Sequence, residues 1–390
     1  MTHRVAMLVA ACAVAASNAA AQAAPSPQKT YTALVASESV DRVAVIEFGP
    51  QGAKVVRQHD VGVMLADPDG PHGLAVTPDG AHYYVTTAHG TPYGVLWKFD
   101  TRSNAYAGQV MLGNFPATAQ VTPDGSKVVV VNFNLHGDMV ASDVSVVRTD
   151  SLQEIARITT CAMPHGSRVN GAGTRHYSTC MIDEQLVEID LDGLQVSRHF
   201  LVTKGAERGM MGAPPVRGAM SASADAAHAG HDMSGHGLAQ PAAGSTTCSP
   251  TWAQPSADDR TVWVACNGTS DIVEIDATSW TLRRRIPAGN GVYNLAVTRD
   301  GTKLVATNKR AQSVSIIDTK TGATMATLPT QRRVVHGVAI THDDRYAFVT
   351  VEGVGSEPGT VEIIDLVALR TVARVDVGQQ AGGIDVVPPL

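Results

Sequence analysis

The stretch Gly70-Pro-His-Gly-Leu-Ala-Val-Thr-Pro-Asp-Gly80, followed by Ala81-His-Tyr-Tyr-Val-Thr-Thr87, decides the fold. It predicts a strand, a tight turn and a second strand, and Val95-Leu-Trp-Lys-Phe-Asp100 adds a third strand. In the turn, Pro presets φ, Asp bonds the backbone ahead of it, and Gly accepts a positive φ. The flanking runs are rich in β-branched and aromatic residues, which strands favour.

This unit recurs along the chain, and the recurrence predicts the architecture. The turn returns, with substitutions, at Val121-Thr-Pro-Asp-Gly125, Val297-Thr-Arg-Asp-Gly301 and Ile340-Thr-His-Asp-Asp344. The third strand recurs seven times and often ends in Asp, as in Val361-Glu-Ile-Ile-Asp365. A period of about 40 to 50 residues with four strand-like runs is the size of a propeller blade. We therefore predict an all-β chain that forms a single seven-bladed β-propeller of four-stranded blades over residues 31–390.

The repeat resembles the YVTN-type β-propeller repeat family. The likeness rests on Val-Thr-Pro-Asp-Gly, on Tyr84-Val-Thr-Thr87 and Ala306-Thr-Asn308, and on the Ile-Ile-Asp strand, and it covers nearly all of the chain after residue 30. It implies a propeller that serves as a binding or scaffold module, with lactonases among related propellers. Fold alone does not decide activity.

The two ends of the chain are expected to share one blade. The run from Tyr31 to Phe48 lacks a leading strand, and Gly382-Gly-Ile-Asp-Val-Val387 matches the pattern of His72-Gly-Leu-Ala-Val-Thr77. We predict that this C-terminal strand closes the seventh blade, because closure removes exposed sheet edges.

The first residues read as a targeting segment. A short basic start, an apolar run from Val5 to Ala16 and the small-x-small site Ala21-Gln-Ala23 predict a signal peptide over residues 1–23. The run is too short to span a bilayer. We expect a periplasmic or secreted protein with no transmembrane segment after cleavage; lipid attachment at Cys12 is the alternative.

Four cysteines remain after cleavage: Cys161, Cys180, Cys248 and Cys266. Each pair occupies similar positions around the first two strands of its repeat. We predict disulfides Cys161–Cys180 and Cys248–Cys266, which an oxidising compartment permits. A thiolate metal site is the alternative, although the spacing fits no common zinc pattern.

Three histidines occupy one slot of the repeat, each followed by Gly: His72, His165 and His336. The slot precedes the strand that lines the channel, so these imidazoles should converge at one mouth, with Tyr293 in the same slot and Arg168 deeper. They are candidate ligand-binding residues, and imidazole also suits transition metals. A structural role, with each imidazole bonded to a neighbouring carbonyl, remains open.

One insertion, residues 205–247, lacks strand character and is expected to be disordered. It contains Gly209-Met-Met-Gly212 and then the candidate metal ligands Met220, His228, His231, Met233 and His236. Imidazole and thioether suit copper, and the run resembles Met/His-rich segments of periplasmic copper-handling proteins. We expect copper, or a similar metal, as the cofactor; a neutral linker and a partner-docking loop are the alternatives.

Composition narrows the function further. The formal net charge is −6 without a basic stripe, which argues against nucleic acid. A phosphate-cradling Gly-rich loop and a Cys-x-x-Cys-His motif are both missing, which argues against nucleotide and haem c. We expect a binding or scaffold protein with a metal ion or a periplasmic protein as partner. A hydrolase, lactonase or lyase that uses the histidine mouth, or a pure protein-interaction module, is the alternative.

Overall fold

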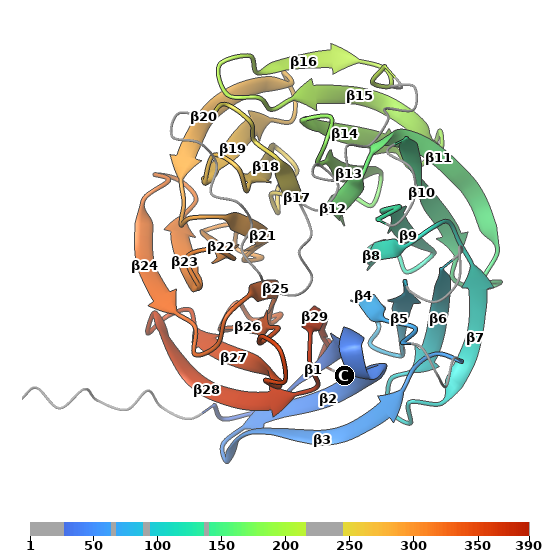
Figure 1. Cartoon of the computed structure of the whole chain (residues 1–390), viewed down its shortest axis with the longest axis vertical. Helices are drawn as coiled ribbons and strands as arrows, with labels where there is room; N and C mark the ends of the chain where they lie inside the picture. The colour runs from blue at the N-terminus through green and yellow to red at the C-terminus, as the bar shows by residue number, and fades with distance from the viewer. Residues whose placement is uncertain (1–26, 64–67, 89–93, 136–139, 216–244, 390) are drawn as a thin grey trace, which may run out of the picture.

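The computed structural model describes residues 27–63, 68–88, 94–135, 140–215 and 245–389. These residues form seven antiparallel sheets arranged in a ring around a central channel (Figure 1). The predicted all-β, seven-bladed propeller is confirmed. Among the described residues the only helical element is the 3-10 turn η1 (Glu38–Val40).

Six blades follow one another along the chain. Within each of them the strands run in chain order from the channel to the outer edge (Figure 1). Blade 1 contains β4 (Pro71–Val76), β5 (His82–Thr87), β6 (Val95–Asp100) and β7 (Tyr106–Met111). Blade 2 contains β8 (Pro116–Val121), β9 (Lys127–Asn132), β10 (Ala141–Arg148) and β11 (Glu154–Ala162). Blade 3 contains β12 (Pro164–Val169), β13 (Arg175–Cys180), β14 (Gln185–Asp190), β15 (Gln195–Leu201) and β16 (Arg208–Met211).

Blades 4 to 6 repeat the four-stranded plan. Blade 4 contains β17 (Pro250–Pro255), β18 (Thr261–Cys266), β19 (Asp271–Asp276) and β20 (Thr281–Pro287). Blade 5 contains β21 (Val292–Val297), β22 (Lys303–Asn308), β23 (Ser313–Asp318) and β24 (Thr324–Pro329). Blade 6 contains β25 (Val335–Ile340), β26 (Tyr346–Val351), β27 (Gly359–Asp365) and β28 (Arg370–Val377).

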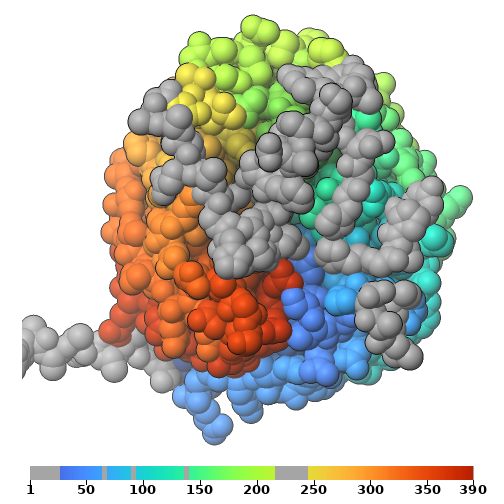
Figure 2. Space-filling view, in the orientation of Figure 1, coloured from blue at the N-terminus to red at the C-terminus, as the bar shows by residue number. Residues whose placement is uncertain are grey.

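The seventh, closing blade joins the two ends of the chain. The C-terminal β29 (Ala381–Val386) pairs with β1 (Tyr31–Ser37), which continues into β2 (Arg42–Gly49) and β3 (Gly52–Asp60). This confirms the predicted closure. In the space-filling view the blue N-terminal segments and the red C-terminal segments lie side by side (Figure 2).

Blade 3 departs from the expected four strands. Its fifth strand, β16, pairs antiparallel with β15 through Arg198↔Met211 to Leu201↔Arg208. The expectation that the whole insertion lacks strand character is therefore wrong for residues 208–211. An edge strand offers unpaired backbone groups as a template, and β16 uses those of β15.

The turns behave as the sequence predicts. Gly80, Gly125 and Gly301 adopt φ of 68°, 73° and 71°, and Asp344 takes the same left-handed position with φ of 57°. That Asp substitutes for Gly because its carboxylate accepts the backbone N–H groups of Arg299 and Asp300, at 2.7 and 2.9 Å, in the preceding blade. Asn and Asp tolerate this conformation better than other residues with a side chain.

Threonines in two second strands tie blade 5 to blade 6 and blade 6 to the closing blade. Thr350 Oγ1 receives the Gly337 N–H of its own inner strand at 2.8 Å and donates to the Gly382 carbonyl of the closing blade at 2.8 Å. Thr307 bridges the Asn294 N–H and the His336 carbonyl in the same way. The hydroxyl suits this place because it both donates and accepts, so the inner strands of blades 5 and 6 and of the closing blade are held in register.

The hydrophobic core lies between blades as well as within them. Across the closure, Ile46 and Phe48 of β2 pack with Phe348 and Ile363 of blade 6. All four side chains are buried, and burial of each is worth about 1.5–3 kcal/mol. This apolar packing positions the seven inner strands that line the site.

Candidate binding site in the central channel

A left-handed backbone turn precedes every inner strand and sets the direction of the slot residues. The residue two places before each slot has a positive φ, from 46° to 68°, in all seven blades: Gly70, Phe115, Met163, Ser249, Gly291, Val334 and Gln380. Only two of these are Gly, although the conformation is unfavourable for residues with a Cβ. The slot residues that follow are His72, Ala117, His165, Thr251, Tyr293, His336 and Gly382. We call this end of the channel the His mouth.

The side chains at the His mouth form a closed circle of six rings, which we call the ring girdle. Neighbouring ring centroids lie 5.0–6.0 Å apart in the order His72, Phe115, Phe133, His165, Tyr293, His336 and back to His72. The four slot residues singled out from sequence are therefore brought together. Phe115 and Phe133 were missed, because they lie outside the repeat motif, in the segments before β8 and after β9.

Hydrogen bonds fix the tautomer of His165. Its Nδ1 lies 2.9 Å from the Thr251 carbonyl and its Nε2 lies 3.2 Å from the Tyr293 hydroxyl. A carbonyl only accepts, so Nδ1 carries the proton, and Nε2 accepts from the phenol. Burial lowers the pKa of His165 to about 3, so the imidazole is neutral. Both ring nitrogens are thus engaged.

Two charged residues, Lys309 and Glu352, lie next to Tyr293 and His336. Lys309 Nζ lies 4.5 Å from the centroid of the Tyr293 ring and 3.2 Å from Glu352 Oε1. The same carboxylate oxygen lies 3.9 Å from His336 Nε2. Burial raises the pKa of Glu352, and the lysine charge opposes that rise. This pair gives the mouth one partly buried cation and one buried acid that the sequence analysis missed.

The channel is nearly closed beneath the ring girdle. The cavity there, lined by the three slot histidines, Trp252 and Asn294, has a volume of about 40 Å³. That is room for about one water molecule. A larger ligand at this end therefore lies at the mouth and not inside the channel.

The opposite end holds a wider cavity of about 320 Å³, formed by the last residues of the inner strands and the turns that follow them. We call it the Arg mouth, because Arg168 and Arg299 line it, with Gln120, Gln254 and Asp385. Arg168 also lines the small cavity beneath the girdle, so it stands at the junction of the two.

The predicted disulfides are confirmed. Cys161–Cys180 and Cys248–Cys266 have S–S distances of 1.97 and 1.99 Å, and all four cysteines are buried. Because all four sulfur atoms are in disulfides, the alternative of a thiolate metal site at these cysteines is excluded. Across residues 27–63, 68–88, 94–135, 140–215 and 245–389, no three His, Cys, Asp or Glu side chains are grouped to hold a metal ion.

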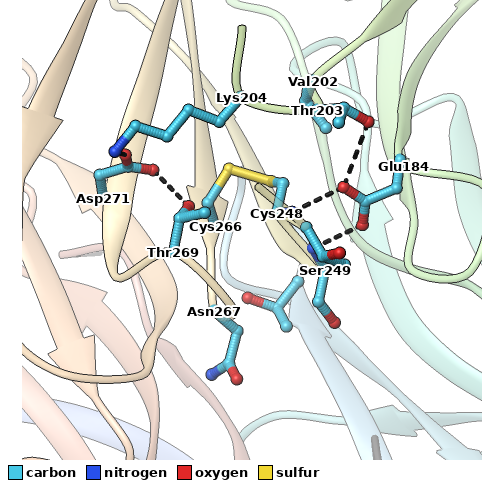
Figure 3. Close-up of a disulfide and its surroundings, with 12 residues drawn as sticks. Glu184, Val202, Thr203, Lys204, Cys248, Ser249, Cys266, Asn267, Thr269 and Asp271 are labelled. Atoms are coloured by element: carbon cyan, nitrogen blue, oxygen red, sulfur yellow. Dashed lines mark hydrogen bonds and ion pairs between the residues drawn. A yellow bond between two sulfur atoms is a disulfide. The ribbon is translucent and has the colours of Figure 1, made fainter. Parts of the chain in front are cut away.

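The second disulfide fastens the point where the chain returns from the insertion (Figure 3). Glu184 accepts the N–H groups of Cys248 and Ser249, both at 2.6 Å. The Lys204 N–H donates to the Thr246 carbonyl at 3.0 Å, so the departing and returning segments lie side by side. The predicted metal ligands Met220, His228, His231, Met233 and His236 lie outside the described residues.

Comparison with known proteins supports the propeller. A family described as the cytochrome D1 heme domain matches residues 299–387, less than a quarter of the chain. No curated protein matches the sequence. The match covers part of blade 5, all of blade 6 and the closing strand β29. The YVTN-type assignment stays a prediction.

Two solved structures share the fold. A functionally unknown protein from Desulfotomaculum acetoxidans has a TM-score of 0.65 at 13% identity, covering 92% of this chain and 99% of that chain. Hydrazine synthase from Kuenenia stuttgartiensis has a TM-score of 0.59 at 19% identity, covering 82% and 91%. At these identities the likeness concerns the fold alone. None of the described segments forms an apolar helix of membrane-spanning length.

The comparisons correct the cofactor expected from sequence. The description of the matched family names haem. Neither that description nor those of the two solved structures mention copper. Copper was expected from a loose His/Met motif, and low-complexity motifs of this kind are compositional signals without a fixed geometry. Haem, not copper, is the cofactor to which the comparisons point.

The His mouth fits haem in its donor chemistry. Haem iron is held by imidazole, phenolate or thioether ligands, and His72, His336 and Tyr293 offer the first two. Phe115 and Phe133 are 1% and 0% exposed and pack on buried Met163 and Met181, so they form the apolar backing of the girdle. The cavity of about 40 Å³ beneath excludes a macrocycle from the channel itself. The fit is therefore with the girdle as a surface at the mouth.

Proposed function

We propose that the protein is an exported binding propeller that holds haem at the His mouth. The observation that carries this proposal is the convergence of three imidazoles and one phenol in a single ring girdle. The match to a haem-domain family supports it, because the matched residues include His336. The predicted signal peptide and the two disulfides support export to an oxidising compartment.

His72 and His336 are the residues that would hold the iron. Their ring centroids lie 5.7 Å apart, and they are 5% and 7% exposed, whereas His165 is 1% exposed. Haem, when bound, supplies one-electron redox chemistry or a site for a small ligand. The chain itself supplies the apolar floor and the buried Lys309–Glu352 pair beside His336.

Haem titration of the protein spanning residues 24–390, followed by its Soret absorption, tests this proposal. We expect saturable binding with one haem per chain, and a shifted or lost band in His72→Ala and His336→Ala. His82→Ala is the matched control, because His82 begins β5 at the opposite end of the blade.

Two results would contradict haem binding at the His mouth. The first is the absence of a saturable Soret shift in the folded wild-type protein, which would favour a pure interaction module. The second is binding that both His72→Ala and His336→Ala leave unchanged, since haem would then be held elsewhere.

A further inference from the structure

Arg168 has no direct ion-pair partner among the described residues and lies at the junction of the two channel cavities. Its Nη1 donates to the Ser167 carbonyl at 3.0 Å, and its Cζ lies 4.5 Å from the centroid of the Trp252 ring. Within the described part of the chain, no carboxylate oxygen lies within 4.0 Å of its guanidinium, in contrast to Arg175, Arg198 and Arg285 of blades 3 and 4.

Toward the described residues, this arrangement leaves most of the hydrogen-bonding capacity of Arg168 unused. A guanidinium has five N–H donors in a planar fork and accepts nothing. Burial lowers the pKa of Arg168 to about 10, which still leaves it charged at neutral pH. A partly buried cation without a carboxylate in direct contact is costly, and an oxyanion would meet the fork with two parallel hydrogen bonds.

The acids of the Arg mouth are engaged with the backbone. Asp385 accepts the N–H groups of Val76 and Val386 at 2.9 and 2.8 Å. Asp344 accepts two backbone N–H groups of the preceding blade. These carboxylates therefore join blades, and Asp385 reaches Arg168 only as a more distant charge.

Other groups at the Arg mouth can donate to an anion. Gln120 uses its side-chain oxygen to accept the Val169 N–H at 2.5 Å, which leaves its NH₂ as a donor. Arg299 is exposed at the rim, where it lines the same cavity. A volume of about 320 Å³ lies at the lower end of the range for small-molecule sites.

We propose that the Arg mouth binds a small oxyanion, either the carboxylate of an organic acid or inorganic phosphate, through the Arg168 guanidinium, with Arg299 at the entrance. Trp252 holds the guanidinium plane by stacking, so that the fork is preorganised. This site lies at the opposite end of the channel from the proposed haem site, and neither proposal depends on the other.

Calorimetric titration and thermal melts with phosphate, succinate and acetate test the site, each against chloride at equal ionic strength. We expect saturable binding of at least one oxyanion, and the order of affinities separates phosphate from carboxylates. Arg168→Gln should weaken binding about tenfold or more, because it removes a charge-assisted pair of hydrogen bonds. Arg168→Lys should fall between, since it keeps the charge and loses the fork.

Two further variants sharpen the test. Asp385→Asn should strengthen binding, because it removes the nearby negative charge. Arg148→Gln is the matched control for net charge: Arg148 is 53% exposed on β10 and pairs with Asp150, and its loss should leave affinity unchanged.

The proposal is overturned if the wild-type protein gives no saturable response to any of the three anions. It is equally overturned if folded Arg168→Gln or Arg168→Lys binds as the wild type does. Circular dichroism establishes folding of each variant, and haem titration of the same variants separates this outcome from failure of the haem proposal.

Discussion

The Tyr293 hydroxyl donates to His165 Nε2 across 3.2 Å, and this bond links blades 3 and 5 past the blade between them. Blade 4 joins the same network, because the Thr251 carbonyl accepts from His165 Nδ1 and Thr251 Oγ1 donates to the Tyr293 carbonyl at 2.7 Å. Three blades are thus joined at the His mouth by Thr251 and by two side chains of the ring girdle, His165 and Tyr293. The candidate site and the stability of the ring are consequently coupled.

Replacing Tyr293 with Phe tests this coupling. The variant leaves the buried His165 Nε2 without its donor, which should lower the free energy of unfolding by about 1–3 kcal/mol. Urea denaturation measures the loss. Tyr106→Phe is the matched control, because Tyr106 is 60% exposed on β7, and it should be neutral. Equal stability of the two variants would show that the bond contributes nothing.

The fold was predictable because its signals are local and repeated. A Thr-x-Asp-Gly turn and a β-branched strand specify their own backbone, and a chain that repeats them every blade has few alternatives to a closed ring. The pattern match of Gly382-Gly-Ile-Asp to His72-Gly-Leu-Ala was enough to predict closure. The disulfides followed from the same alignment of strands.

The site was only half predictable. The slot histidines were found because the repeat alignment places them together. The left-handed turns at Phe115, Met163, Val334 and Gln380 leave no such signal, because these residue types rarely adopt positive φ and tertiary packing must impose it. Lys309 and Glu352 were missed because their pairing joins the ends of second strands in different blades.

The disulfide Cys248–Cys266 should stabilise the protein measurably. Its sequence separation of 18 residues corresponds to about 3 kcal/mol on the chain-entropy estimate. The double variant Cys248→Ser/Cys266→Ser should therefore unfold at a lower urea concentration under oxidising conditions. Because Cys161–Cys180 spans 19 residues, its double variant should show a similar loss. A loss seen in neither variant would refute the estimate.

Removing residues 382–390 should open the ring. The deletion takes away most of β29, including buried Ile384 and Val386 and the Asp385 bond to the Val76 N–H. Loss of two buried aliphatic side chains alone is worth about 3–6 kcal/mol. We expect a strongly lowered melting temperature in calorimetry. Deletion of residues 388–390, which follow the strand, is the control, and equal melting of the two deletions would contradict closure by β29.

Acid should destabilise the turn that joins the first and second strands of blade 2, β8 and β9. Hydrogen bonds from the Thr122 hydroxyl, and from the hydroxyl and N–H of Ser126, lower the pKa of Asp124 to about 2. The folded-state pKa lies below the unfolded value of about 3.9, so the charged turn stabilises above pH 4. This contribution is lost as the pH falls from about 4 to 2.

The variant Asp124→Asn isolates that contribution. Its melting temperature should lie below that of the wild type at pH 7, and the difference should shrink towards pH 2, because the wild-type carboxylate is then protonated. Melting curves across this range provide the measurement. A difference that is the same at both pH values would show that the charge of Asp124 is not the cause.

Substitution of the Gly that follows a slot histidine should destabilise the fold, because a Cβ there would meet atoms of the next blade. A Cβ at Gly166 would collide with the Thr251 carbonyl and the Trp252 ring of the next blade, both of them buried. Gly166→Ala should therefore lower the free energy of unfolding by about 1–3 kcal/mol, as overpacking does. It should also disturb the stacking of Trp252 on Arg168, and so weaken anion binding at the Arg mouth. Gly193→Ala is the control, since the nearest atom to its added Cβ is the Gln195 side chain at 3.3 Å. A Gly166→Ala protein as stable as this control would mean that neighbouring inner strands can move apart, and that the His-Gly pair does not depend on their close approach.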